Sequence, residues 1–350
     1  MLYLFVGGGS VGHLAPLVAV WRELKEMDPT ATALFVCSNK ESDAQYLRAE
    51  GVLFETLPLP RRSLALPLTL YRAIRRSKRI IRRSKPAAIF SKGGSVSVPL
   101  CLAAKRRRIP IVHHESDARA GYASRLISRM AKKVCVGFPG ALDGALFTGN
   151  PVRPFVTKGS EKEGRAITGF AGKRPVLLVI GGSQGARALN DAVRTMQEEL
   201  LMIVDIVHIT GQGKTGAPGA HGYRALSFAH KELPHLYAIA DLALSRGGAG
   251  NLSELGANGI PTIVCPLRGV AQNHQFFNAK SAEASGGCVV VLQEQLREEL
   301  IPTLQKMLRN DNLKIMARAF RSFGKPDAAR KIAILLQEVA MRKQRSKARH

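Results

Sequence analysis

Cysteine, aromatic residues and acidic residues are all scarce in this sequence of 350 residues. The five cysteines are scattered and form no C-x-x-C pair, so neither a disulfide framework nor a zinc site is expected, and we interpret them as reduced core residues of a cytoplasmic protein. There is no G-x-x-x-x-G-K-[ST] loop and no D-x-D pair that would hold a metal-bound nucleotide sugar. We therefore predict no metal and no other cofactor.

Long apolar runs are also missing. No uninterrupted apolar segment approaches the ~18 residues of a spanning helix, so we expect a protein that can touch a membrane without crossing it. The first residues enter a predicted strand directly, without the basic and apolar regions of a signal peptide.

Positive charge is abundant and unevenly placed. Lysine and arginine number 52 against 26 acidic residues, which leaves a net charge of +26. Between Arg61 and Cys135 the sequence holds 20 lysines and arginines but only two acids, Glu115 and Asp117. Such a balance indicates an anionic partner, which can be nucleic acid, anionic lipid or a phosphorylated substrate.

One pattern occurs twice. The apolar run LYLFV (2–6) leads into GGGSVGH, and VLLVI (176–180) leads into GGSQGAR. A short β-prone run, a glycine-rich turn and a helix-forming stretch are typical of a nucleotide-binding α/β unit, whose backbone N–H groups and helix N-terminus face an anion. The repeat predicts two phosphate-handling domains that face one another.

Apolar runs and helical patterns alternate along the whole chain, which predicts an α/β fold with parallel sheets and crossover helices. The two prolines of TGNPVRPF (148–155) suggest a hinge, and after Gly286-Gly287 the pattern becomes mostly helical. We predict a first domain over 1–155 and a second over 156–324. Residues 325–350 are predicted to form a helix that returns to the first domain and ends in a basic tail.

The segment 61–86 combines leucines with ten cations and contains no acid. It can be a solvated basic helix that covers the sheet, or a surface for anionic lipid headgroups whose leucines enter the interface. Aromatic residues for a nucleic-acid groove are limited to Tyr71, so we favour the membrane and expect no nucleic-acid partner. The predicted membrane patch comprises Leu64, Leu66, Leu68, Leu70, Arg72, Arg75, Arg76 and Arg79.

Two glycine-rich turns of the second half can hold a diphosphate. In GGSQGARALN (181–190), Ser183, the turn backbone and the next helix N-terminus are suitable, although an ordinary tight turn has the same pattern. After LSRGGAG (244–250) we predict a helix from Asn251 or Leu252, with Glu254 in its first turn. Glu254 can cap the helix through its dipole or bind two ribose hydroxyls.

Polar side chains in three other segments are candidates. His274, Gln275 and Asn278 are neutral groups suited to sugar hydroxyls, but they also fit an exposed loop. His13, at the start of a helix, can be a packed residue or a general base. KGGSVSVP (92–99) and HHESDARAG (113–121) each follow a predicted strand, so we expect them at the carboxyl edge of the sheet with the glycine turn.

Taken in order, GGxxGH, HES, TGNPVR, GGSQGAR, ITGQ (209–212), SRGGAGNLSE and HQFFNA resemble the MurG family over nearly the whole chain, to about residue 335. These are the N-acetylglucosaminyltransferases that convert lipid I to lipid II in peptidoglycan synthesis. The resemblance implies a GT-B fold, in which two Rossmann-like domains enclose a cleft. The second domain binds UDP-N-acetylglucosamine, and the first binds lipid I, an undecaprenyl-pyrophosphoryl muramyl peptide, at the cytoplasmic face of the bacterial membrane.

The resemblance also implies the residues of the site. Ser183 and the turn 248–253 would hold the diphosphate, Glu254 the ribose, Gln275 with His274 the sugar, and the region of Ala229 or His230 the uracil. The implied donor contacts are Ser10, Val11, Gly12, Asp117, Arg153, Ser183, Gln184, Gly185, His230, Gly248, Ala249, Gly250, Asn251, Glu254, His274 and Gln275. The implied acceptor contacts are Gly9, Ser10, Gly12, Gly93, Gly94 and Ser95.

The implied reaction is an inverting, metal-independent displacement in which the muramyl 4-hydroxyl attacks the anomeric carbon and UDP leaves. His13 is the candidate base and Glu115 its rival. The sequence departs from the family pattern at Val11, Ser95, Val98 and Ser116-Asp117, all on the acceptor side. Two alternatives are a related GT-B transferase with another lipid acceptor and a basic nucleic-acid-binding protein.

Overall fold

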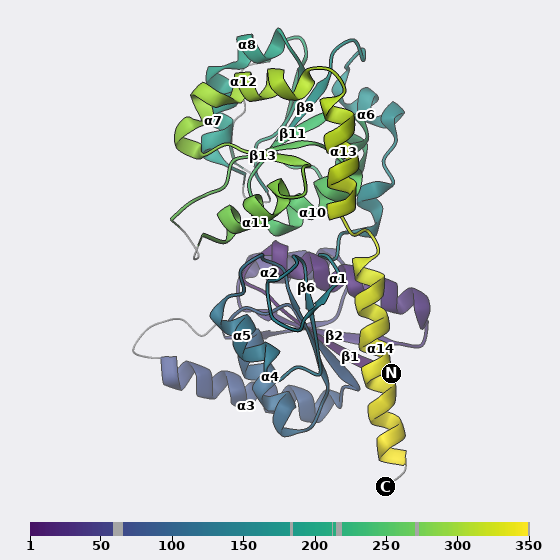
Figure 1. Ribbon diagram of the computed structural model, residues 1–350. Helices are drawn as coiled ribbons and strands as arrows, with labels where there is room; N and C mark the ends of the chain where they lie inside the picture. The colour runs from purple at the N-terminus through teal and green to yellow at the C-terminus, as the bar shows by residue number, and fades with distance from the viewer. Residues whose placement is uncertain (59–65, 183–184, 212, 215–218, 270–272, 349–350) are drawn as a thin grey trace. The chain divides into compact units, whose positions relative to one another are not determined.

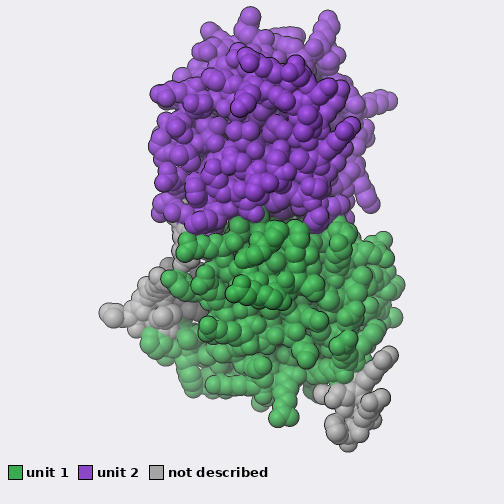
Figure 2. Space-filling view, viewed as in Figure 1, with its two compact units in different colours: residues 1–151, 327–350 green, residues 152–326 purple. Residues whose placement is uncertain are grey.

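The computed structural model describes residues 1–58, 66–182, 185–211, 213–214, 219–269 and 273–348 (Figure 1). The chain divides into two compact units, coloured separately in Figure 2. Unit 1 comprises residues 1–151 and 327–350, and unit 2 comprises residues 152–326. The sequence predicts boundaries after residues 155 and 324, and the observed divisions fall after Pro151 and Pro326.

Unit 1 is built on a seven-stranded sheet in the order β3-β2-β1-β4-β5-β6-β7, and all neighbouring strands are parallel. Its strands are Leu2–Val6 (β1), Thr32–Ser38 (β2), Phe54–Leu57 (β3), Ala88–Ser91 (β4), Ile111–Glu115 (β5), Lys133–Val136 (β6) and Leu146–Phe147 (β7). Its helices are Val11–Met27 (α1), Glu41–Ala49 (α2), Leu66–Ser84 (α3), Ser97–Arg106 (α4), Tyr122–Ser128 (α5) and Ala328–Ala348 (α14).

Helices cover both faces of this sheet because successive side chains of a strand point to opposite sides. Tyr3 and Phe5 of β1 join the core formed with α1 and α14, whereas Leu4 and Val6 join the core formed with α3, α4 and α5. Four of the five residues of β1 are fully buried. A continuous apolar run is therefore the expected pattern for such a strand.

Unit 2 contains a six-stranded parallel sheet in the order β10-β9-β8-β11-β12-β13. Its strands are Val176–Ile180 (β8), Asp205–Ile209 (β9), Tyr223–Leu226 (β10), Leu242–Ser245 (β11), Thr262–Val264 (β12) and Cys288–Val290 (β13). Its helices are Glu161–Thr168 (α6), Arg187–Thr195 (α7), Gln197–Leu201 (α8), Leu233–Ile239 (α9), Ala249–Asn258 (α10), His274–Glu283 (α11), Leu296–Leu308 (α12) and Asn312–Phe323 (α13). Short 3₁₀ turns span Pro154–Thr157 (η1) and Gln293–Gln295 (η3).

The two-domain parallel α/β fold predicted from the alternation is confirmed. The chain is also mostly helical after Gly287, as predicted, since α12, α13 and α14 follow the short strand β13 (Cys288–Val290). This strand has only three residues, too few to stand out as an apolar run.

All five cysteines are buried and unpaired. Within the described ranges, no helix has the length and apolar character needed to span a membrane.

Candidate functional site

The two glycine-rich turns of unit 2 lie side by side at the carboxyl edge of its sheet. They follow β8 and β11, which are hydrogen-bonded neighbours. A Cβ atom on Gly182 would lie 3.6 Å from the side-chain nitrogen of Asn251, so the turns approach closely. Ser183 and Gln184, both predicted donor contacts, lie outside the described residues. Their neighbours Gly182 and Gly185 close the turn through a 2.9 Å backbone hydrogen bond.

The second turn leads directly into α10. This helix begins at Ala249 with Gly248 as its N-cap, and not at Asn251 or Leu252 as predicted. Ala249, Gly250 and Asn251 form its first turn, where backbone N–H groups have no intrahelical acceptor and favour an anion. The prediction that Glu254 lies in the first turn is therefore wrong, because the helix already begins at Ala249 and includes Gly250, so Glu254 lies one turn further along.

Glu254 is held by an arginine and a tyrosine. Arg153 forms a bidentate pair with it, with Nε donating to Oε1 and Nη2 to Oε2, each at 2.8 Å. The hydroxyl of Tyr237 donates to Oε2 at 3.1 Å. Only 8% of Glu254 is exposed, so the carboxylate is largely removed from water and compensated by these donors. The helix-capping interpretation of Glu254 finds no support in this arrangement.

His230 is linked to Arg153 through the ring of Phe155. The guanidinium of Arg153 lies 5.3 Å from the centre of the Phe155 ring, and that ring meets His230 edge-on with 5.6 Å between ring centres. Arg153 thus connects Glu254 to the Phe155 ring, which in turn contacts His230. An edge-on aromatic pair therefore lies next to the Arg153–Glu254 ion pair.

His274 and Gln275 lie in the first turn of α11, whereas a loop was one expectation for them. The side-chain oxygen of Gln275 accepts the backbone N–H of Leu267 at 3.0 Å, and Asn278 donates to the carbonyl of Gly247 at 3.1 Å. The Asn278 contact fastens α11 to the second glycine turn, and the Gln275 contact fastens it to the loop after β12. Asn278 is buried, so its hydrogen bond to the turn lies inside the protein.

In unit 1, the first glycine turn is anchored by a carboxylate. The buried Asp43 of α2 accepts the backbone N–H of Gly9 and the hydroxyl of Ser38, each at 2.7 Å. The ammonium of Lys40 donates to the carbonyl of Gly9 at 2.7 Å. The Gly9 amide, a predicted acceptor contact, is thus engaged within the protein.

His13 lies in the first turn of α1, as the sequence predicts. Its Nδ1 atom is 3.1 Å from the hydroxyl of Ser10, the N-cap residue. The backbone of Val11 and Gly12 completes this turn, while the side chain of Val11 lies outside the described part of the structure. The hydroxyl of Ser10 therefore fixes one nitrogen of the imidazole.

The loops after β4 and β5 meet through a buried lysine. Lys92 follows β4 directly and is 3% exposed. Its ammonium lies 2.7 Å from Nδ1 of His114 and also contacts the hydroxyl of Ser116. Nε2 of His114 faces the carbonyl of Gly149 at 2.9 Å, so this nitrogen carries the proton and Nδ1 accepts. Burial lowers the pKa of Lys92 to about 8.

Glu115 ends β5 at the same edge and is 8% exposed. Burial raises the pKa of its carboxyl group, and the nearby charge of Asp117 acts in the same direction. The backbone N–H of Asp117 donates to Oε1 of Glu115 at 2.9 Å. A Cβ atom on Gly94 would lie 3.8 Å from the carbonyl of Gly8, so the turn of Gly93, Gly94 and the exposed Ser95 approaches the first glycine turn.

Helix α3 carries the predicted membrane patch. Leu68 and Tyr71 are 52% and 56% exposed, and Leu70 is half-buried. Ala73, Ser77, Ile80 and Ile81 are buried, so α3 packs on the sheet by its other face. Leu64 and the side chain of Leu66 lie outside the described residues. The four arginines predicted for the patch, Arg72, Arg75, Arg76 and Arg79, are all exposed.

Both units match domains of a known protein family. The N-terminal domain of glycosyltransferase family 28 matches residues 3–136, and the C-terminal domain of the same family matches residues 176–332. The two matches lie in unit 1 and largely in unit 2, respectively.

Known proteins match over nearly the full chain. A UDP-N-acetylglucosamine–N-acetylmuramyl-(pentapeptide) pyrophosphoryl-undecaprenol N-acetylglucosamine transferase of Lachnoclostridium phytofermentans is 34% identical, over 97% of this chain and 99% of its own. The transferase of that name from Clostridium kluyveri is 33% identical, over 96% and 98%. The crystal structure of Acinetobacter baumannii MurG superposes with a TM-score of 0.78 at 25% identity, over 96% and 99%. This chain belongs to the MurG family.

Sequence reasoning within the MurG family pattern misses several residues that hold the site together. Tyr237 and Phe155 contact Glu254 and Arg153, and Lys92 and Asp43 anchor the loops of unit 1. Apolar spacing assigns Tyr237 and Phe155 to the core. The sequence did contain a hint for Lys92, because this lysine directly follows the apolar run of β4, where a buried side chain is expected.

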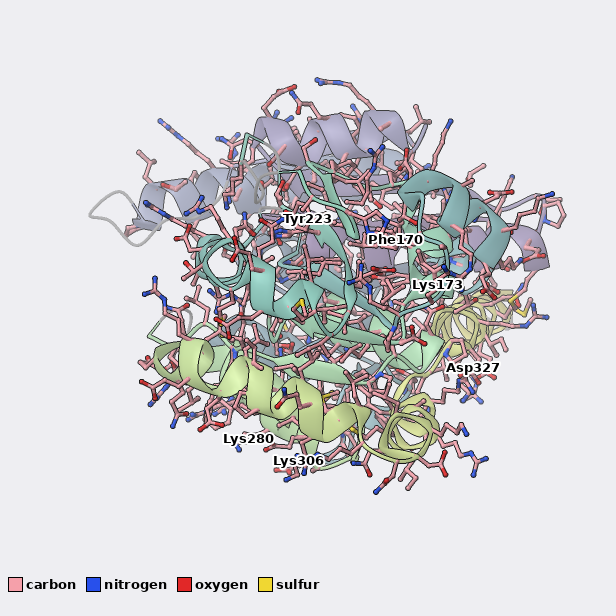
Figure 3. The ribbon with its side chains drawn as sticks, turned by 90° about the horizontal axis from the view of Figure 1, so that it is seen from above. Phe170, Lys173, Tyr223, Lys280, Lys306 and Asp327 are labelled. Atoms are coloured by element: carbon pink, nitrogen blue, oxygen red, sulfur yellow. The ribbon has the colours of Figure 1, made fainter. Side chains whose placement is uncertain are left out.

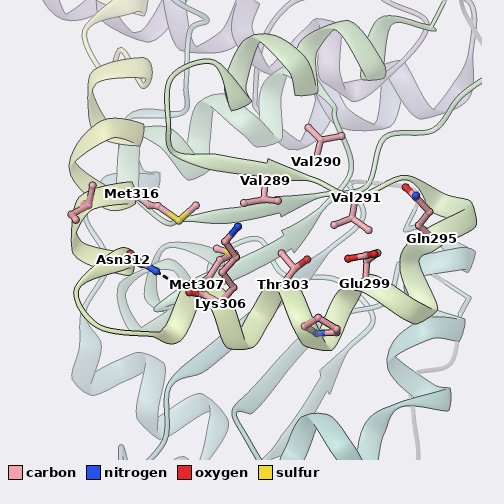
Figure 4. A pocket seen from close by; sticks show the side chains of 12 residues that line it. Val289, Val290, Val291, Gln295, Glu299, Thr303, Lys306, Met307, Asn312 and Met316 are labelled. Atoms are coloured by element: carbon pink, nitrogen blue, oxygen red, sulfur yellow. Dashed lines mark hydrogen bonds between the residues drawn. The ribbon is translucent and has the colours of Figure 1, made fainter.

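One cavity of unit 2 lies away from these MurG-family motifs. It has a volume of about 550 Å³ and is lined by β13, α12 and α13, including Val289, Thr303 and Met316 (Figure 4). The side-chain nitrogen of Asn312 donates to the carbonyl of Lys306 at 2.9 Å at its edge. Among the residues that the structure describes, none of the predicted site residues lines it.

Proposed function

We propose that this chain transfers N-acetylglucosamine from UDP-N-acetylglucosamine to the muramyl 4-hydroxyl of lipid I, which gives lipid II for peptidoglycan synthesis. One observation carries the proposal. A relative whose name states this activity is 34% identical over 97% of the chain, so both units are matched. The geometry of each unit supports a role for it.

Unit 2 is the donor domain in this proposal. The turn closed by Gly182 and Gly185 and the first turn of α10 offer backbone N–H groups to the diphosphate. Glu254 offers carboxylate oxygens to the ribose hydroxyls. The edge-on pair of Phe155 and His230 lies next to Arg153, and an aromatic ring of this pair can contact a planar base. Gln275 and His274, at the start of α11, face the sugar.

Unit 1 is the acceptor domain in this proposal. The loops after β1, β4 and β5 lie at one sheet edge, where His13 lies in the first turn of α1, Ser95 follows β4 and Glu115 ends β5. Parallel sheets bind ligands outside the carboxyl ends of their strands, which is where these loops lie. The pyrophosphate of lipid I would bind at the turns of Ser10 and Gly94.

The reaction is a single displacement. The oxygen of the muramyl 4-hydroxyl bonds to the anomeric carbon, the bond from that carbon to the UDP oxygen breaks, and UDP leaves with the electron pair. The proton of the hydroxyl passes to a base. His13 is our candidate because it lies in the first turn of α1 at the glycine-rich turn, where the hydroxyl of Ser10 contacts its Nδ1 and orients the imidazole. Glu115 is the rival, and its raised pKa makes it a stronger base than an ordinary carboxylate.

The acceptor is a lipid, so the enzyme must meet the membrane. Leu68 and Tyr71 of α3 are exposed among arginines, as expected for a helix at an anionic lipid surface. A cavity of about 610 Å³ in unit 1, between the starts of β5 and β6 and helix α14, is lined by six lysines and arginines and one glutamate. Both features support peripheral binding at the cytoplasmic face.

Vesicle sedimentation tests the membrane part of the proposal. We expect the protein to sediment with phosphatidylglycerol vesicles and not with phosphatidylcholine vesicles. Replacing Arg72, Arg75, Arg76 and Arg79 by glutamine should abolish the difference. Equal sedimentation of this variant and the wild type would remove α3 from the role.

Two measurements test the activity. UDP and UDP-N-acetylglucosamine should raise the melting temperature, whereas strongly salt-dependent RNA binding without such a shift would favour a nucleic-acid-binding protein. Labelled sugar should pass from UDP-N-acetylglucosamine to lipid I and not to diacylglycerol. Transfer to diacylglycerol alone would indicate another GT-B transferase.

The base is tested separately. His13→Ala should lower kcat by about 100-fold or more with UDP affinity unchanged, whereas Glu115→Gln should leave more activity. Full turnover in His13→Ala would move the role to Glu115.

A further inference from the structure

Three elements of unit 2 converge on the carboxylate of Glu254. Arg153 comes from the segment before η1, Tyr237 from α9 and Glu254 from α10. Together they place three hydrogen bonds on two oxygens, two from the guanidinium and one from the tyrosine hydroxyl. No motif of the sequence includes Tyr237.

The two donors differ in their freedom to move. The side chain of Arg153 is 20% exposed and reaches Glu254 from a loop. Tyr237 is 2% exposed and belongs to the same hydrophobic core as Leu236 and Leu252. Burial, followed by the charge of Glu254, raises the pKa of the Tyr237 hydroxyl well above its ordinary value. The hydroxyl therefore remains a proton donor fixed in direction.

A ribose needs acceptor positions that Arg153 now occupies. A carboxylate has about four lone-pair sites, and three of them accept hydrogen bonds here. Two neighbouring ribose hydroxyls can bind both oxygens only if Arg153 gives up at least one of its bonds. The hydrogen bond from Tyr237 can persist, because it comes from the buried side.

We propose that Tyr237 is a positioning residue that orients Glu254 to recognise the paired 2′- and 3′-hydroxyls of a uridine diphosphate. This inference rests on the proposed function, since it takes a nucleoside diphosphate as the ligand. Without the tyrosine hydroxyl, Oε2 loses its one buried donor, and the carboxylate can follow Arg153 instead of presenting both oxygens to the ribose.

The test compares two ligands on three proteins. UDP and 2′,3′-dideoxy-UDP are titrated calorimetrically into the wild type, Tyr237→Phe and Tyr223→Phe. Tyr223, labelled in Figure 3, is the matched control, because its hydroxyl also makes a buried hydrogen bond in unit 2, to His208 at 2.9 Å. Circular dichroism and the melting temperature establish that each variant is folded.

We expect Tyr237→Phe to bind UDP about tenfold more weakly than the wild type and to bind 2′,3′-dideoxy-UDP with unchanged affinity. In Tyr223→Phe the ratio of the two affinities should equal that of the wild type. The ratio is decisive, because a general loosening of unit 2 weakens both ligands alike.

Several results would overturn the inference. Equal losses for both ligands in Tyr237→Phe would show that the tyrosine only supports the fold. Unchanged UDP affinity would show that Arg153 suffices, and equal affinity of the wild type for both ligands would show that Glu254 does not read the ribose. In each case UDP still binds the wild type. Absence of UDP binding to the wild type would instead contradict the proposed function itself.

Discussion

Replacing Gly185 by alanine should disable the diphosphate turn of unit 2, whereas the same change at Gly213 should not. Both glycines have a left-handed backbone, with φ of +65° and +69°. A Cβ atom at position 185 would lie 2.1 Å from the carbonyl oxygen of Thr210, but a Cβ at position 213 meets nothing within 4 Å. The pair separates backbone strain, which both variants share, from a steric conflict that only Gly185→Ala creates.

The magnitudes follow from these two contributions. A left-handed alanine costs about 1–2 kcal/mol. Overpacking against the backbone of Thr210 adds about 1–3 kcal/mol at position 185, because the turn and β9 must separate by roughly 1.3 Å to restore a 3.4 Å contact. We therefore expect about 2–5 kcal/mol for Gly185→Ala and about 1–2 kcal/mol for Gly213→Ala. A displacement of that size should also weaken UDP binding by tenfold or more.

Urea unfolding followed by circular dichroism measures the stability of each variant, and calorimetric titration measures UDP affinity. Trp21, the only tryptophan, belongs to unit 1, so its fluorescence is a poor probe for this change. Equal losses of stability and affinity in the two variants would refute the steric argument. So would a Gly185→Ala protein that binds UDP as tightly as the wild type.

Two further predictions concern buried cations. Burial lowers the pKa of Lys92 from 10.5 to about 8. Between these pH values the unfolded chain therefore binds more protons than the folded protein. The contribution of Lys92 to the free energy of unfolding consequently rises by about 3 kcal/mol as the pH increases from about 8 to 10.5. Trp21 fluorescence should show that rise in the difference between wild type and Lys92→Met, and a flat difference would contradict a buried ammonium. Arg246 donates to the carbonyl of Cys265 at 2.9 Å and to Gln293 at 2.7 Å, and lysine cannot reproduce this fork. Arg246→Lys should cost about 2–3 kcal/mol in urea unfolding of unit 2, and a loss below about 0.5 kcal/mol would contradict the role of the fork.

The central strands of both sheets could be predicted from the sequence, and the edge strands could not. LYLFV and VLLVI are continuous apolar runs because both faces of β1 and β8 are covered. Edge strands such as β10, with its two exposed residues, and the two-residue β7 bury less side-chain surface. Their composition then resembles that of a loop.

The positions of the motifs could be predicted more readily than their contacts. Strand ends place the glycine turns at a common edge, but neither spacing nor composition reveals that Arg153 pairs with Glu254 across 101 residues. Tyr237 was equally hidden, because a buried tyrosine in a helix has the same periodicity as any core residue. Long-range pairing depends on loop geometry that local patterns do not encode.

Helix α14 has a consequence for the order in which the protein forms. Ile332, Leu336 and Ala340 of this helix are buried in the same core as Phe5 and Phe35 at the other end of the chain. A ribosome completes residues 1–151 before it starts unit 2, which is one continuous segment. The sheet of unit 1 still lacks the packing of α14 while unit 2 is being made. The amino-terminal half therefore remains incomplete longest, and maturation of unit 1 ends only when the last helix has been made.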